Sequence, residues 1–98
     1  MFGGDMMQKL QEMQKQMEES KKKLDTIKVE EIIEGKLKIV ANGNRKIESI
    51  EIINHQEMEQ EELEDYLIMA MNRVMEKASN VHDSEMASSA KGLIPGMM

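Results

Sequence analysis

The chain has 98 residues and a formal net charge of −6, from 19 acidic and 13 basic side chains. That length predicts one domain over residues 1–98, and the negative balance argues against a polycationic nucleic-acid tail, although a local lysine cluster can still bind DNA. With 12 Met, one Phe, one Tyr and neither Trp nor Cys, the composition excludes disulfides, thiolate zinc sites and cysteine nucleophiles, and it gives a core that specifies shape poorly.

The opening segment, MFGGDMMQKL, shows no targeting signal. It lacks a basic region followed by an apolar run, so it does not resemble a signal peptide. No stretch of the sequence approaches the roughly 18 apolar residues of a membrane span. We therefore expect a soluble cytoplasmic protein without a membrane partner.

Residues 5–26 are predicted to form a helix, because they contain no Gly or Pro and many good helix formers. Apolar residues in and just after this segment fall at alternating steps of four and three, a heptad pattern that only Ser20 breaks. The stripe comprises Met6, Leu10, Met13, Met17, Leu24 and Ile27. A stripe this narrow is typical of a seam between helices, although methionine-rich surfaces also serve as grooves for peptides.

Residues 27–53 change to a period of two, which predicts three antiparallel strands with one buried face. Apolar side chains alternate with charged ones over 27–30 and again over 36–39. The pair Glu34-Gly35 marks the first turn. Asn42-Gly43 predicts the second as a type I′ turn, in which both central residues need positive φ.

The third strand has an irregular spacing. Ile47 and Ile50 are three residues apart, and Ile52 follows at two. A β-bulge near Glu48-Ser49 would place all three isoleucines on one side of the sheet. The predicted result is a three-stranded meander with one face available to helices.

A second helix is predicted over residues 56–84. Asn54, with Glu57 three residues later, resembles a capping box. Six acidic residues between Glu57 and Asp65 suit the positive end of a helix dipole. The segment 88–98, which contains Gly, Ser and Pro, is predicted to be a flexible tail.

The apolar band of this second helix wraps beyond one face. In YLIMAMNRVM, eight of ten residues are apolar, which is more than one small sheet can cover. Ile68, Met71 and Met75 therefore need another partner. We predict that a second subunit covers them, so that they form a dimer interface.

Side-chain chemistry gives little indication of catalysis. His55 and His82 are far apart in the sequence, and isolated histidines are mostly solvated. No Ser/His/Asp set, phosphate loop or HExxH motif occurs, and the paired carboxylates are typical of solvated faces. We expect no catalytic residue, metal, cofactor or small-molecule substrate.

Basic residues concentrate near the end of the first predicted helix, with a second pair at i, i+4 on the other helix. A row of lysines can contact successive phosphates of duplex DNA without reading bases. Residue types alone favour a simpler interpretation, in which lysines near a helix C-terminus suit the dipole and keep the surface soluble. No aromatic residues are interleaved, so base stacking on single strands is not expected. The candidate DNA-binding residues are Lys15, Lys21, Lys22, Lys23, Arg73 and Lys77.

The whole pattern resembles the YbaB/EbfC family of bacterial nucleoid-associated proteins. The likeness rests on four segments that stand in the family's order and spacing: MFGG, MMQKLQEMQKQMEES, GKLKIVANGNRKIESIEI and EMASSAKGLIPGM. The Asn-Gly pair followed by KIESIEI is the most specific piece.

This resemblance implies an α+β fold with the order α-β-β-β-α and a tweezer-like homodimer, whose sheets pair across the dimer and whose helices project as arms. It also implies binding of double-stranded DNA with little sequence demand, in nucleoid organisation or gene regulation. Methionine-rich arms and acidic charge favour an alternative, a dimeric interaction scaffold or chaperone-like clamp that grips polypeptide and does not bind DNA.

Overall fold

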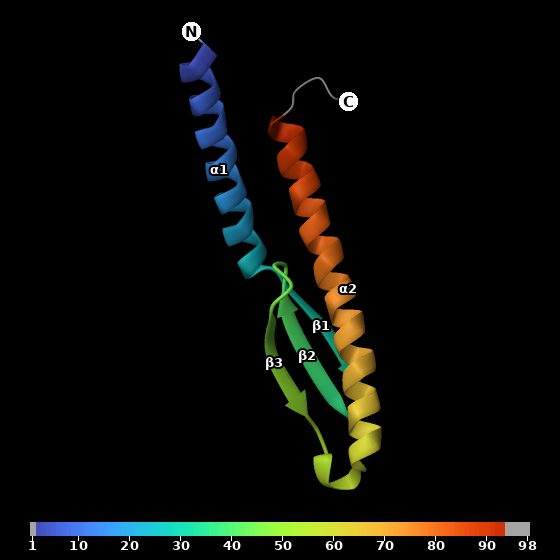
Figure 1. Cartoon of the computed structure of the whole chain (residues 1–98). Helices are drawn as coiled ribbons and strands as arrows, with labels where there is room; N and C mark the ends of the chain where they lie inside the picture. The colour runs from blue at the N-terminus through green and yellow to red at the C-terminus, as the bar shows by residue number, and fades with distance from the viewer. Residues whose placement is uncertain (1, 94–98) are drawn as a thin grey trace.

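Two long helices joined by a small sheet make up the structure (Figure 1), a computed structural model that describes residues 2–93 and the side chains of 5–88. The elements follow in the order α1 (Phe2–Thr26), β1 (Lys28–Ile33), β2 (Leu37–Asn42), β3 (Ile47–Ile52), the 3₁₀ helix η1 (His55–Glu57) and α2 (Gln60–Leu93). The strands form one antiparallel sheet in the order β1-β2-β3. The predicted α+β class and α-β-β-β-α order are confirmed.

The molecule is long and thin. Its principal extents are 69 × 23 × 18 Å and its radius of gyration is 19.2 Å, whereas a compact domain of 100 residues has a radius of about 13 Å. The first half of α2 packs on the sheet, while α1 and the second half of α2 project beyond the same end of it as two arms (Figure 1). The core is thus confined to the sheet end.

The second helix begins later than the predicted residue 56. Asn54 makes no side-chain cap; it adopts a left-handed conformation (φ 56°) and starts the short helix η1. Met58 then returns to extended backbone (φ −103°, ψ 137°) before α2 begins at Gln60. The capping-box pattern therefore marked the 3₁₀ turn and not the α-helix.

The second helix also ends later than predicted. It continues past 84 to Leu93, because the intervening residues contain no Pro, several good helix formers and a single Gly near the end. The tail predicted over 88–98 thus begins within α2, and 94–98 lie outside the described residues. For α1 the predicted end at 26 is confirmed, and the helix begins at Phe2 and not at 5.

The core lies between α2 and the inner face of the sheet. Leu37, Ile39 and Ala41 alternate along β2 and are fully buried, as the period of two predicted. They pack against Ala70 and Val74 of α2. Because α2 packs on β1 and β2 and much less on β3, the inner face of β3 is only partly covered.

A β-bulge places the isoleucines of β3 on that inner face. In the ladder with β2, the residue between Ile47 and Ser49 has no partner, so Glu48 is the extra residue and the predicted bulge is confirmed. The flanking isoleucines then stand opposite the buried residues of β2 and share the inner face with them. Ile50, opposite Ile39, nevertheless remains 45% exposed.

The β1–β2 turn was predicted at Glu34-Gly35, and it is confirmed there. The Lys36 N–H donates to the Ile33 carbonyl across the turn (2.9 Å). Gly35 has a φ of 74°, which is a conformation that glycine adopts without the cost other residues incur.

The β2–β3 turn differs from the predicted type I′ turn at Asn42-Gly43. The Arg45 N–H donates to the Asn42 carbonyl (3.0 Å), and the positive φ (64°) falls on Arg45 and not on Gly43. This is a three-residue loop, in which a type I turn is followed by a left-handed residue. The Asn42 Oδ1 atom supports it by accepting from the N–H of Asn44 (2.9 Å). The type I′ prediction is therefore wrong.

Gly43 is required for a close approach and not for a positive φ. Its N–H donates to the carbonyls of Leu24 (2.9 Å) and Ile27 (3.0 Å), where α1 ends. A Cβ atom on Gly43 would lie 2.8 Å from Leu24 Cδ2 and 2.9 Å from the Leu24 carbonyl oxygen. Leu24 is itself fully buried, so the hairpin and α1 meet here backbone to backbone.

Gly43→Ala should lower the free energy of unfolding by about 1–3 kcal/mol, the usual cost of forcing atoms into a packed site. Urea denaturation at a fixed protomer concentration measures this decrease. Gly35→Asn is the matched control, because nothing lies within 4 Å of the missing Cβ there and Asn tolerates a left-handed conformation. A Gly43→Ala variant as stable as the wild type would contradict the close approach.

Candidate nucleic-acid interface

The six basic residues predicted to bind DNA fall into two groups. Four of them are exposed on the arm formed by α1, namely Lys15, Lys21, Lys22 and Lys23. The other two, Arg73 and Lys77, lie on the flank of α2 that contacts β1. The two groups therefore have different surroundings and different electrostatic partners.

Arg73 and Lys77 are held by a carboxylate of the sheet. Lys77 Nζ lies 2.8 Å from Glu31 Oε2 and also donates to the Glu30 carbonyl (2.8 Å), and Arg73 Nη1 lies 3.7 Å from Glu31 Oε1. Glu31 is on the inner face of β1, opposite Ile39, and its side chain is only 13% exposed. These two basic residues thus compensate a nearly buried charge and fasten α2 to β1.

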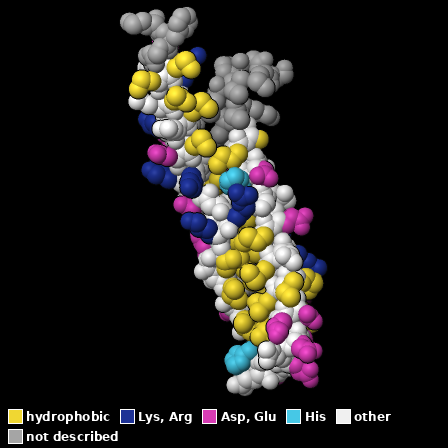
Figure 2. All heavy atoms as spheres, viewed as in Figure 1, with side chains coloured by type: hydrophobic (Ala, Val, Ile, Leu, Met, Phe, Trp, Pro, Cys, Tyr) yellow, Lys and Arg dark blue, Asp and Glu magenta, His cyan; other side chains and the backbone are white. Residues whose placement is uncertain are grey.

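The remaining basic residues separate by location. An ion pair joins Lys23 to Glu85 (3.1 Å). Other ion pairs join glutamates to Lys28 and Lys38 in the sheet and to Lys36 in the β1–β2 turn. Among the described side chains, the basic residues without an acidic partner within 4.0 Å lie on α1 or at the tip of the β2–β3 hairpin. They are Lys9, Lys15, Lys21, Lys22, Arg45 and Lys46. Figure 2 shows Lys and Arg side chains gathered where α1 meets the rest of the molecule.

Negative charge gathers at the other end of the molecule. Helix α1 carries five acidic and five basic residues, so the acidic excess of the chain lies outside this arm. Six acidic residues from Glu57 to Asp65 surround η1 and the start of α2, at the end remote from α1 (Figures 1 and 2). A polyanion would therefore meet its least repulsive surface at the α1 side.

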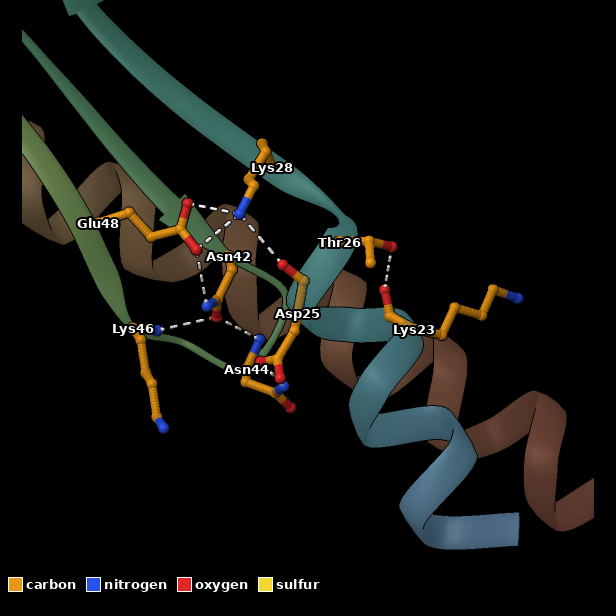
Figure 3. A network of polar contacts seen from close by, with 8 residues as sticks. All are labelled: Lys23, Asp25, Thr26, Lys28, Asn42, Asn44, Lys46 and Glu48. Atoms are coloured by element: carbon orange, nitrogen blue, oxygen red, sulfur yellow. Dashed lines mark hydrogen bonds and ion pairs between the residues drawn. The ribbon is translucent and has the colours of Figure 1, made fainter.

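The hairpin tip is tied to α1 by side chains as well as by backbone. Asn44 Nδ2 donates to the Lys21 carbonyl (2.8 Å). It also donates to Asp25 Oδ1 (2.5 Å; Figure 3). Both acceptors belong to the last turns of α1. Together with the Gly43 contacts, these bonds fix the tip beside the basic end of the arm.

Glu48, the bulged residue, organises the other side of this junction. Its carboxylate lies 2.5 Å from Lys28 Nζ and accepts a bond from Asn42 Nδ2 (3.1 Å), and Lys28 Nζ also donates to the Asp25 carbonyl (3.1 Å) (Figure 3). Hydrogen bonds from Lys28 and then Asn42 hold the pKa of Glu48 below its usual value of 4.5. The bulge thus places a charged acceptor between β1 and the hairpin turn.

The three residues predicted to form a dimer interface lie on the flank of α2 toward β3. Successive helical residues are about 100° apart, which puts Ile68, Met71 and Met75 on the side away from the ion-paired basic residues. Ile68 is 61% and Met71 39% exposed, whereas Met75 is partly buried against the core. Ile50 of β3 is also 45% exposed, and Figure 2 shows hydrophobic side chains gathered over the sheet end of the molecule.

Other kinds of site receive no support from the described residues. Within residues 2–93 no three His, Cys, Asp or Glu side chains are arranged to hold a metal ion. Over the same range, no helix is both long and apolar enough to cross a membrane.

A model of the YbaB/EbfC DNA-binding family matches residues 2–93. The chain belongs to this family. A nucleoid-associated protein of Flavobacterium johnsoniae is 43% identical over 96 residues, covering 94% of this chain and 91% of that protein. Nucleoid-associated proteins of Ruminiclostridium cellulolyticum and Pelotomaculum thermopropionicum are each 34% identical, covering 98% and 99% of this chain and 90% and 99% of their own lengths. The resemblance inferred from the four sequence segments is confirmed.

Within this YbaB/EbfC protein, sequence reasoning missed the basic hairpin tip. Arg45 and Lys46 directly follow the Asn-Gly pair in the segment NGNRK. The place of these two residues just after a predicted turn could have indicated them, although two basic residues are not a conspicuous cluster. Residues just after a turn lie on the surface, where binding residues are often found. Sequence reasoning also missed Glu31, which occupies an inward position of the period-two pattern.

The contribution of the Glu48 hydrogen bonds to stability should depend on pH. A carboxyl whose pKa is lowered by folding stabilises the protein fully above its unfolded pKa, and this contribution disappears as the pH falls through the folded-state pKa. The destabilisation caused by Glu48→Gln should therefore be largest at neutral pH and shrink as the pH falls below 4.5. Thermal midpoints across this range measure it.

Glu51→Gln is the control for that series. Glu51 lies exposed on the same strand and has no ion-pair partner among the described side chains. A Glu48→Gln difference that is the same at acid and neutral pH would show that the carboxylate bonds do not stabilise the junction.

Proposed function

We propose that this protein binds duplex DNA as a homodimer with little sequence specificity, and that it contributes to nucleoid organisation and gene regulation. The observation that carries the proposal is the segregation of unpaired positive charge onto α1 and the hairpin tip. The family is a DNA-binding family, and the relatives are named nucleoid-associated proteins. We accordingly place the protein in the cytoplasm at the nucleoid, in a role that is not enzymatic.

The phosphate contacts are assigned first to the α1 arm. Lys15 and Lys22 are one heptad apart, so they lie on one face of the helix about 10 Å from each other. Neither has an acidic partner among the described side chains, and nor does Lys21. Lysines spaced in this way contact the backbone of DNA and read no sequence.

Arg73 and Lys77 are the less favourable of the predicted contacts. A DNA phosphate would have to compete with Glu31 for both side chains. Removing the cations from Glu31 would leave a carboxylate that is nearly buried without compensation. Any binding by these two residues would therefore weaken their ion pairs with Glu31.

The proposed homodimer follows from surface that one chain leaves uncovered. Ile50 on β3 is exposed, and so are Ile68 and Met71 on α2. β3 is also an edge strand of the sheet, so its outer backbone groups are open to pairing with another chain. A second copy would cover the apolar surface and give each dimer two α1 arms.

A polypeptide clamp remains the second candidate, and one observation favours it. The methionine stripe of α1 is exposed in the described chain at Met6, Leu10, Met13 and Met17. Between the arms, Met17 and Met86 line an open depression of about 440 Å³. Apolar gripping of peptide persists at high salt, whereas DNA affinity falls steeply, so salt dependence separates the two functions.

Changing Lys21, Lys22 and Lys23 together to Gln should weaken binding of a labelled random duplex. Every phosphate that the variant no longer neutralises should reduce the slope of log K against log salt by about 0.9. Fluorescence anisotropy at several salt concentrations measures the slope. An unchanged slope in the triple variant would remove these lysines from the interface.

Ile50→Lys should dissociate the proposed dimer, because it would bury an unpaired ammonium twice in a symmetric interface. We expect the dissociation constant to rise more than about 100-fold, equivalent to roughly 3 kcal/mol. Sedimentation equilibrium should show the wild type at twice the 11.3 kDa chain mass. Glu51→Lys, on the opposite face of β3, is the matched control and should stay dimeric. A folded wild-type monomer at micromolar concentration would refute the dimer.

A further inference from the structure

We propose that the tip of the β2–β3 hairpin is a second phosphate-binding element, in which Arg45 and Lys46 extend the basic surface of α1 onto the sheet. This inference rests on the proposed function, because its ligand is the backbone of the same DNA duplex. It assigns contacts to the body of the molecule, whereas the α1 lysines lie on the arm.

The tip is held rigidly next to the arm. Gly43 binds the carbonyls at the end of α1, and Asn44 binds the Lys21 carbonyl one turn earlier. The residue that follows, Arg45, is therefore fixed beside the helical turn that carries Lys21 and Lys22. A phosphate-binding group placed on an ordered turn loses little conformational freedom when DNA binds.

The basic side chains at the tip form no ion pair with the neighbouring acids, each of which has another partner. Asp25 accepts from Asn44, and Glu48 is paired with Lys28. Among the described side chains, Arg45 and Lys46 have no ion-pair partner, and both are exposed. The tip therefore presents positive charge that the fold itself does not neutralise.

The backbone conformation of Arg45 also supports a phosphate-binding role for the hairpin tip. Its φ of 64° is left-handed, a conformation in which Gly or Asn is far more comfortable than a long side chain. Residues held in such a conformation concentrate at functional sites. An arginine at this position makes the turn less stable than Gly or Asn would, but its planar guanidinium group can bind a phosphate through two hydrogen bonds.

The experiment compares the salt dependence of duplex binding for the wild type and the double variant Arg45→Asn/Lys46→Gln. Asn tolerates the left-handed position, so the turn should be retained. Removing both phosphate-binding groups should lower the log–log slope by about 1.8 for each protomer that engages the duplex. The matched control is Lys36→Gln/Lys38→Gln, which removes two ion-paired charges at the opposite end of the sheet and should leave the slope unchanged.

A single variant, Arg45→Gly, separates binding from folding. Glycine relieves the left-handed backbone, so the variant should unfold at a higher temperature than the wild type while its slope falls by about 0.9 per protomer. Should the double variant fail to fold, this single variant decides the question. A slope equal to that of the wild type would overturn the hairpin assignment.

Failure of the proposed function has a different signature. If the wild type binds the random duplex without salt dependence, or not at all, then the DNA-binding proposal fails and the hairpin inference falls with it. If the wild type binds with a steep slope that the α1 variant reduces and the hairpin variants do not, only the hairpin inference is overturned.

Discussion

The meeting of Gly43 with the end of α1 is the contact on which the arrangement of the arm depends. A helix leaves its last carbonyls without partners inside the helix. Here the Gly43 N–H donates to the carbonyl of Leu24 in the last turn and to that of Ile27, the residue that follows the helix. The hairpin thus caps the helix, and no residue with a Cβ fits between them. Asn44 and the Glu48 bonds act around this point, so that a turn of the sheet and a turn of the helix become one rigid junction.

Similar basic side chains have different roles in this fold because acidic partners are unevenly distributed. On the flank of α2, Arg73 and Lys77 meet Glu31 and are used to join helix to sheet. On α1 and the hairpin tip, Lys23 pairs with Glu85, and the other described lysines and Arg45 meet no acidic partner among the described side chains. A protein with net negative charge can therefore present a surface suited to DNA, since what matters is the local balance of charge and not the total.

Local patterns predicted the elements well, and tertiary contacts explain where they failed. The heptad of α1 and the alternation of β2 depend on neighbours in sequence, so periodicity found them. The turn type could not be predicted from Asn42-Gly43, because Gly43 is packed against Leu24, a residue distant in the sequence. Likewise the α1 lysines were visible as a run, whereas the engagement of Lys77 depends on Glu31, a residue distant in sequence that only the packing of α2 on β1 brings near.

The length of α1 has a mechanical consequence. Among the side chains of α1 that the structure describes, from residue 5 onward, only Ser20 and Leu24 are buried, and the helix itself begins at Phe2. Lys9 stands about 22 Å along the axis from Leu24, at about 1.5 Å per residue. A tilt of about 10° at that pivot would swing Lys9 through about 4 Å, by the same geometry. The arm is thus a lever held at one end, and the bonds of the hairpin to the end of α1 set its direction relative to the sheet.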